Sequence, residues 1–297
     1  MASIFKWQPR SSHGDLFGAG VQQQLARWNQ ARLEPRLPDE DWRDTFDTDR
    51  AMLELEGTFL KQLRADVAIA VADVPSDADA FIGWFEALEL EGPGQHDPLF
   101  DWLADSADLE QLRWYLAQEA AGEAGFEDLT AYTQVKLPSR IKLELARNYW
   151  DEMGRGNAKG MHGPMLDRMV EALDLKPSIE GTVPESLALA NAMTAMATRR
   201  DHAWHALGAL GAIELTAPAR SAAVAKGLKR HNVAAKNRLY FDLHAVLDVK
   251  HSIAWNAEAL VPAVAQDSRR AQAIAEGALI RLTCGARCFE RYRRELW

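Results

Sequence analysis

The 297-residue sequence has few cysteines and no long apolar run, and each shortage excludes a class of protein. Cys284 and Cys288 are too few to cross-link a chain of this length, so we expect two reduced residues packed inside a last helix. The longest apolar runs, such as DVAIAVADV, fall far short of the ~20 residues that span a bilayer. The first residues also lack the features of a secretory signal. We therefore predict a cytoplasmic protein without a membrane partner.

An excess of positive charge is missing as well. The 34 Lys and Arg residues are outnumbered by 43 Asp and Glu residues, and the formal net charge is −9. Such a chain repels a phosphate backbone, and its basic residues form no block interleaved with aromatics. We expect a small-molecule ligand and no nucleic acid, and the composition leaves a homodimer open.

Strand patterns are nearly absent, whereas apolar residues recur at three- and four-residue steps in almost every segment after Thr48. Pro, Gly, Asp and Ser stand at the breaks between segments, where helix caps are expected, and one break is expected between GALGAIEL and APARSAAVAKGLKR. No long linker or internal repeat is present. We predict an all-α fold, with one helical domain over residues 46–297. An N-terminal extension, residues 1–45, is expected to pack on it and to carry a short helix near residues 21–32.

The segment RLYFDLHAVLDVKHSIAW holds two histidines and an aspartate at helical offsets of zero, four and seven. At about 100° per residue, His244, Asp248 and His251 share one helix face. The apolar neighbours expected to turn this face inward are Leu243, Val246, Leu247, Ile253 and Trp255. Buried ionisable groups are costly unless they are satisfied, and a metal ion satisfies three at once. A three-residue pattern taken alone is nevertheless more typical of ordinary core hydrogen bonds.

Four residues in other segments are candidates to complete a metal site. Glu119 follows LRWYLAQ, Glu152 ends RNYWDE, and His162 ends the Gly-rich EMGRGNAKGMH. Glu214 stands near the end of the apolar stretch GALGAIEL. The three glutamates together with Asp248 carry four negative charges, which balance two ferrous ions, and mixed nitrogen and carboxylate ligands suit non-haem iron. Structural zinc favours thiolate ligands, and calcium or magnesium favours oxygen alone.

This combination resembles the haem-oxygenase-like diiron oxidases and oxygenases, which are iron-containing redox enzymes. The resemblance covers about residues 112–262 and rests on the E-x9-H spacing from Glu152, on Glu214 thirty residues before the next motif, and on H-x3-D-x2-H itself. It implies a single-domain haem-oxygenase-like helical bundle that binds two Fe(II) ions per chain and uses O2 as co-substrate. The metal ligands that it implies are Glu119, Glu152, His162, Glu214, His244, Asp248 and His251.

Two of these placements have competitors. Glu123 lies one helical turn after Glu119 and is an alternative to it, and Glu144 competes with Glu152 but lacks the Gly-rich segment that follows. The resemblance implies oxidation of a small amine or carboxylate derived from an amino acid, by N-oxygenation, desaturation or oxidative C–C cleavage, in specialised metabolism. Candidates to bind a substrate carboxylate are Arg199, Arg200 and Arg220.

Other functions stay open at this point. Haem oxygenation would use the same fold but would leave the carboxylates without a role. A thiaminase-like hydrolase needs a cysteine nucleophile facing the pocket, whereas both cysteines stand in the C-terminal segment. A metal-free binding protein of the same fold is a further alternative. A ferritin-like diiron bundle is excluded, because it requires two Glu-x-x-His pairs and the sequence contains none.

Overall fold

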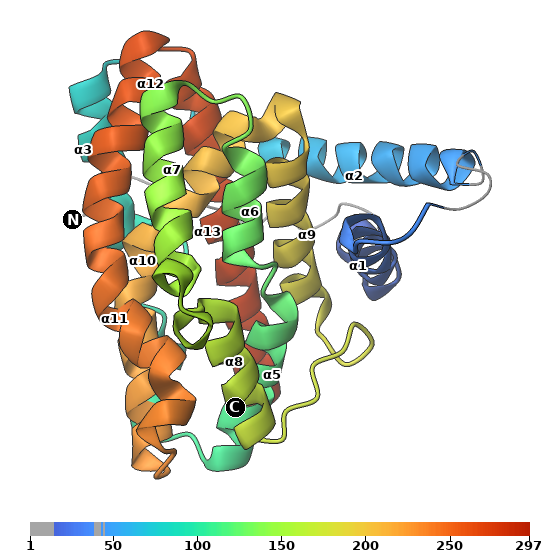
Figure 1. Cartoon of the computed structure of the whole chain (residues 1–297), viewed down its shortest axis with the longest axis vertical. Coiled ribbons are helices and arrows are strands. Elements are labelled where there is room, and N and C mark those ends of the chain that lie inside the picture. Colours follow the sequence, from blue (N-terminus) through green and yellow to red (C-terminus); the bar gives the residue numbers. More distant parts are fainter. Residues whose placement is uncertain (1–14, 39–42, 44) are drawn as a thin grey trace.

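The computed structural model describes residues 15–38, 43 and 45–297 (Figure 1). Over these residues the chain forms α-helices, short 3₁₀ turns and one π-helical turn, without a β-strand, which confirms the all-α prediction. Within the same residues, no helix is long and apolar enough to cross a membrane. The helices are α1 Ala19–Leu33, α2 Phe46–Val67, α3 Ala78–Glu91, α4 Pro98–Asp105, α5 Leu109–Gly122, α6 Phe126–Thr133, α7 Ser139–Glu152, α8 His162–Ala172, α9 Pro184–Thr198, α10 Ala203–Arg230, α11 Ala235–Trp255, α12 Val261–Gln266 and α13 Arg270–Leu296.

The centre of the bundle is formed by α10, which packs on α11 on one side and on α13 on the other. In Figure 1, α13 runs behind α6 and α7, and α11 lies at the left edge. Two glycines allow the close contact between α10 and α13. A Cβ atom added to Gly208 would lie 1.9 Å from the Ile274 carbonyl oxygen, and one added to Gly277 would lie 1.9 Å from the His205 carbonyl oxygen. Neither position has room for a side chain.

The breaks between helices differ in part from those expected. α10 continues through Pro218, where a break was expected between two segments, although the proline removes the N–H that would bond to the Glu214 carbonyl. Burial of most of α10 between its neighbours stabilises it against this loss. The chain is instead interrupted by the 3₁₀ turn Arg200–His202, between α9 and α10. The short helices α4, α6 and α12 were not predicted, because eight residues or fewer carry little periodicity.

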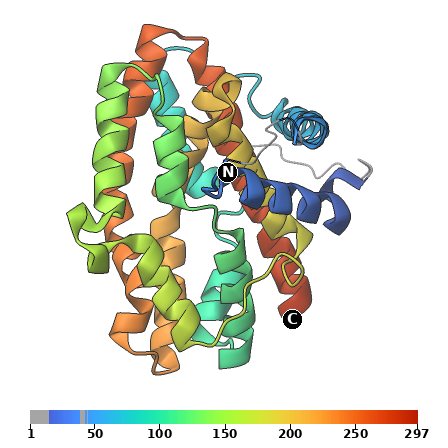
Figure 2. The same ribbon diagram turned by 45° about the vertical axis from the view of Figure 1, so that its right-hand side comes forward.

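The first described helix lies outside the bundle, beside α9, in both views (Figures 1 and 2). A buried amide network joins the two helices. Asn29 Nδ2 donates to Asn191 Oδ1 at 2.9 Å, and Asn191 Nδ2 donates to the Gln22 carbonyl and side-chain oxygens at 2.9 Å. The helix predicted near residues 21–32 is thus present as α1, whereas the start of the predicted extension, residues 1–14, lies outside the described residues.

Candidate metal centre

Six of the seven residues predicted as metal ligands form two groups. In each group, one ligand atom from each of three residues lies within 4.8 Å of the other two, among the residues that the structure describes. The two groups lie close together. The charge of Glu214 raises the pKa of Glu152 in the other group as well as that of Asp248 in its own. Group 1 is Glu152, His162 and His244, and group 2 is Glu214, Asp248 and His251.

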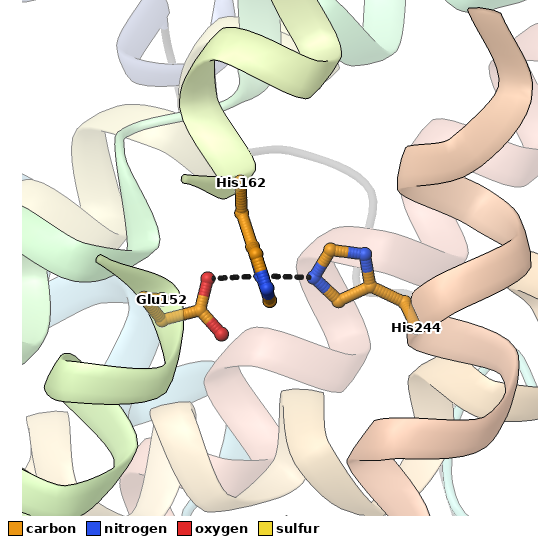
Figure 3. Close-up of side chains that lie close together, drawn as sticks. All are labelled: Glu152, His162 and His244. Atoms are coloured by element: carbon orange, nitrogen blue, oxygen red, sulfur yellow. Dashed lines mark hydrogen bonds and ion pairs between the residues drawn. The ribbon is translucent and has the colours of Figure 1, made fainter. Parts of the chain in front are cut away.

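Group 1 depends on a tight Gly-rich connection between two helices. Glu152 is the last residue of α7 and His162 is the first residue of α8. Between them Gly154 has a φ of +60°, and a Cβ atom there would lie 2.3 Å from the Gly160 carbonyl carbon. The chain therefore folds back on itself, and Glu152 Oε2 comes within 2.6 Å of His162 Nδ1 (Figure 3). The glycines expected to mark this motif serve to bring the two ligands together.

The third member of group 1 presents an unprotonated nitrogen. His244 Nδ1 lies 2.6 Å from the Tyr240 carbonyl oxygen, which can only accept, so Nδ1 carries the hydrogen. His244 Nε2 then points toward His162 Nδ1, at 3.1 Å (Figure 3). Burial, followed by the neighbouring His162, lowers the pKa of His244 to about 4 and keeps the ring neutral. A neutral imidazole with a free Nε2 is the form that binds a metal ion.

Group 2 contains a buried nitrogen without a partner. His251 Nε2 lies 3.2 Å from Asp151 Oδ2, whereas its Nδ1 is buried, makes no hydrogen bond and lies 3.5 Å from Glu214 Oε2. Asn148 Nδ2 donates to the other oxygen of Glu214 at 2.5 Å. Asp151 and Asn148 were not predicted, although they precede Glu152 by one and four residues on the same helix. Asp151 contacts His251 and Asn148 contacts Glu214, so both can orient candidate metal ligands by hydrogen bonds.

The carboxylates of the two groups crowd one another. Burial raises the pKa of Asp248, and the charges of Glu214 and Glu152 raise it further. Burial also raises the pKa of Glu152. Burial alone would lower the pKa of His251, but its pairing with Glu214 and Asp151 outweighs this effect and raises the pKa to about 9. The proton on His251 thus supplies positive charge where a metal ion would otherwise supply it. The carboxylate oxygens and imidazole nitrogens of the two groups suit such an ion.

Glu119 and its competitor Glu123 occupy different surroundings in the structure. Glu119 accepts a hydrogen bond from the Tyr292 hydroxyl at 2.8 Å and belongs to neither group. Glu123, which follows the last residue of α5, lines a cavity together with ligands from both groups. Burial, followed by the charge of Glu127, raises the pKa of Glu123 to about 7. The competitor Glu144 is bound to Arg147 at 2.5 Å and lies apart from both groups.

Two of the apolar neighbours on α11 do not face inward as expected. Val246 is 66% exposed and Ile253 is 67% exposed, while Trp255 is fully buried. Asp248 and His251 are 3% and 8% exposed, so the polar side chains are the ones that enter the core. The prediction that the triad points inward agrees with this burial, but the reason given for it is wrong for Val246 and Ile253.

One cavity adjoins the two groups, and a second cavity shares part of its lining with the first. The first has a volume of about 110 Å³ and is lined by Glu152, Glu214, His244 and Asp248. The second has a volume of about 130 Å³ and contains Arg220. Residues shared by both linings are Glu123, Leu189, Ile213, Ala217, Ser221, Tyr240 and Arg281.

Of the three arginines proposed to bind a carboxylate, only Arg220 lines one of these cavities. Arg199 lies 3.6 Å from Glu56, and Arg200 donates to backbone carbonyls, among them that of Tyr132 at 2.9 Å. Arg281, by contrast, was not predicted, because nothing in its own segment marks it as facing the ligands of α10 and α11.

The chain belongs to the iron-containing redox enzymes, whose family model matches residues 113–286. Its structure is similar to the crystal structure of a CADD-like protein of unknown function from Nostoc punctiforme PCC 73102. The two are 19% identical with a TM-score of 0.51, over 81% of this chain and 98% of the other, and this likeness shows a shared fold alone. A comparison with curated proteins gives no match. The predicted family and the predicted haem-oxygenase-like fold are confirmed.

Proposed function

We propose that the protein is a non-haem diiron oxidase or oxygenase that uses O2 to oxidise a small molecule. The observation that carries this proposal is the pairing of the two ligand groups in a chain of the iron-containing redox family, with one cavity lined by members of both. Group 1 would hold one iron ion and group 2 the other. Glu123 is the additional carboxylate best placed to contribute, since it lines the same cavity.

Iron bound at these residues supplies redox and Lewis-acid chemistry toward O2. The chain itself fixes the orientation of the ligands. The Tyr240 carbonyl holds the hydrogen of His244 on Nδ1, and the Asp151 carboxylate pairs with Nε2 of His251. Both contacts leave the opposite ring nitrogen directed at its ligand group.

Part of the cavity lining is apolar and would restrict water near the reacting molecule. Its apolar members are Phe126, Leu129, Leu189, Met193 and Ile213. A substrate with an apolar part fits this wall, and the remaining polar groups are available to orient it. Amine N-oxygenation, desaturation and oxidative C–C cleavage all use such an arrangement, and the ligands do not select among them.

A cysteine-dependent hydrolase is disfavoured by the surroundings of the thiols. Burial raises the pKa of Cys284 to about 11 and that of Cys288 well above its usual range. Both thiols are therefore protonated at neutral pH, whereas a nucleophilic cysteine acts as the thiolate. Neither residue lines the two cavities.

Anaerobic titration with ferrous iron tests the proposal and separates it from a metal-free binding role. The wild-type protein should take up about two irons per chain and then consume O2, because the two groups offer two sets of nitrogen and oxygen donors. His244→Ala should lose iron from group 1. Glu144→Gln, which changes a buried carboxylate of the same bundle outside both groups, serves as the matched control and should bind iron normally. Iron uptake no higher than background in the wild type contradicts the proposal.

A further inference from the structure

Two arginines line the second cavity without a carboxylate partner. Arg220 comes from α10 and Arg281 from α13. Arg281 Nη1 is buried and makes no hydrogen bond, and within the described part of the chain neither guanidinium has a carboxylate oxygen within 4.0 Å. Other arginines of α13 differ, since Arg287 lies 2.6 Å from Asp66 and Arg294 lies 2.5 Å from Glu290.

The contacts of Arg220 leave its positive charge uncompensated. Its Nε donates to the Thr216 carbonyl oxygen at 3.0 Å, and its guanidinium lies 5.4 Å from the centre of the Phe289 ring. Burial, followed by the charge of Arg281, lowers the pKa of Arg220 to about 10. Two like charges therefore act on each other in a partly enclosed space. An anion bound between them would offset this cost.

The two acidic residues that line this cavity form no ion pair with the arginines. Glu119 accepts a hydrogen bond from the Tyr292 hydroxyl, and Glu123 also lines the cavity of the metal groups. The buried Nη1 of Arg281 is therefore left without an acceptor among the described residues. A bound anion would supply that acceptor. A planar guanidinium favours a carboxylate, which it can bind through two parallel hydrogen bonds.

We propose that Arg220 and Arg281 bind the carboxylate of a monocarboxylic substrate, whose apolar body lies between Leu189 and Ile213 and reaches the metal groups. This inference rests on the proposed function for the reaction, but the binding of the carboxylate does not require iron. Leu189, Ile213 and Arg281 line both cavities, so one molecule can extend from the arginines to the ligands. The reacting carbon is then at the end of the molecule opposite its carboxylate.

Calorimetric titration with hexanoate, octanoate and phenylacetate tests the inference on iron-free protein and on anaerobic ferrous protein. At least one of the three should bind both forms with similar affinity, and the alcohol of the same carbon skeleton should bind more weakly. Arg281→Gln and Arg220→Gln should each weaken carboxylate binding by about tenfold to a hundredfold. Iron stoichiometry should stay unchanged in both variants. Arg294→Gln, on the same helix but outside the cavity, is the matched control and should bind like the wild type.

Arg281→Lys provides a second test in case Arg281→Gln does not fold, because lysine keeps the positive charge but lacks the planar guanidinium group. With circular dichroism equal to that of the wild type, it should bind the carboxylate more tightly than Arg281→Gln and more weakly than the wild type. Three results overturn the inference. The first is that none of the three acids binds, and the second is that acid and alcohol bind equally well. The third is that the acid binds only when iron is present and that Arg281→Gln does not change its affinity. The last result would place the carboxylate on the metal. Failure of iron uptake alone would reject the diiron function and leave the binding experiment intact.

Discussion

Two buried clusters of charge in this protein are completed in different ways. Around Glu276 of α13 the chain supplies its own partners, the Arg64 guanidinium at 2.6 Å and the His205 imidazole at 2.9 Å. The pairing outweighs the effect of burial and lowers the pKa of Glu276 to about 2. In groups 1 and 2 the neighbours of the carboxylates are imidazoles and further carboxylates, and the pKa of Asp248 is raised. The first cluster is an ion-pair network, whereas in the second three carboxyl groups are accompanied by a single protonated imidazole, His251, and a metal ion would bring further positive charge.

Asp248→Asn should give the largest difference between the clusters. Iron affinity should fall by at least about a hundredfold, because an amide neither carries the charge nor binds iron as a carboxylate does. Stability of the iron-free protein should change by less than about 1 kcal/mol, since the raised pKa already favours the uncharged acid there. Ferrous titration and urea unfolding measure the two effects. A large loss of iron-free stability would instead make group 2 an ion-pair network like that of Glu276.

Glu276→Gln should show the opposite behaviour. We expect the free energy of unfolding to fall by about 2 kcal/mol, because Arg64 and His205 lose a buried counter-charge, with half of Arg64 in contact with water. Iron uptake should be unchanged. Urea unfolding measures the loss, and Glu258→Gln, which breaks the exposed pair with Arg140, should cost almost nothing by comparison. Equal losses of unfolding free energy in Glu276→Gln and Glu258→Gln would contradict the view that Glu276 belongs to a stabilising buried ion-pair network.

The contribution of Glu276 should also depend on pH. Its pKa in the folded state, about 2, is below the ordinary value of 4.5, so its stabilisation is complete above about pH 4.5 and is lost as the pH falls toward 2. The difference in unfolding free energy between wild type and Glu276→Gln should be constant from pH 7 to 5 and should shrink below that range. Urea unfolding as a function of pH checks this. If the difference in unfolding free energy grew as the pH fell, it would contradict the lowered pKa of Glu276.

The smallest expected effect distinguishes Glu119 of α5 from Glu123, which follows the end of that helix. Glu123→Gln should weaken iron binding by about tenfold, as expected for a carboxylate at the margin of a metal site, and Glu119→Gln should leave it unchanged. Ferrous titration of both variants under the same conditions measures the difference. The reverse order would return Glu119 to the ligand set implied by the sequence.

The fold was predictable because helical periodicity runs through nearly every segment. Short helices such as α4, α6 and α12 were not predictable, because they contain too few residues to show that periodicity. The placement of His244, Asp248 and His251 on one helix was predictable from their spacing. The orientation of these side chains was inferred from apolar neighbours, two of which lie in solvent, because the core takes the polar face of this helix. Glu123 illustrates another limit. α5 ends at Gly122, and beyond that residue helical spacing no longer says where a side chain points.

The roles of Asp151, Asn148 and Arg281 depend on which helices meet, and no local pattern encodes that. Arg281 is separated in sequence from every ligand and reaches the cavity because α13 packs against α10. The sequence therefore supports prediction of donors that repeat on one helix. It does not reveal the groups on other helices that contact those donors or line the cavities.

The glycine contact between α10 and α13 bears on how far apart the residues of the site lie. α10 carries Glu214 and Arg220, and α13 carries Arg281, so the approach of these helices affects how far Arg281 lies from both residues. At Gly208 and Gly277 the two backbones approach so closely that a Cβ atom has no room. A side chain at either position would push the helices apart and move Arg281 away from Glu214 and Arg220. Two residues that line neither cavity thus contribute to the spacing of groups that do.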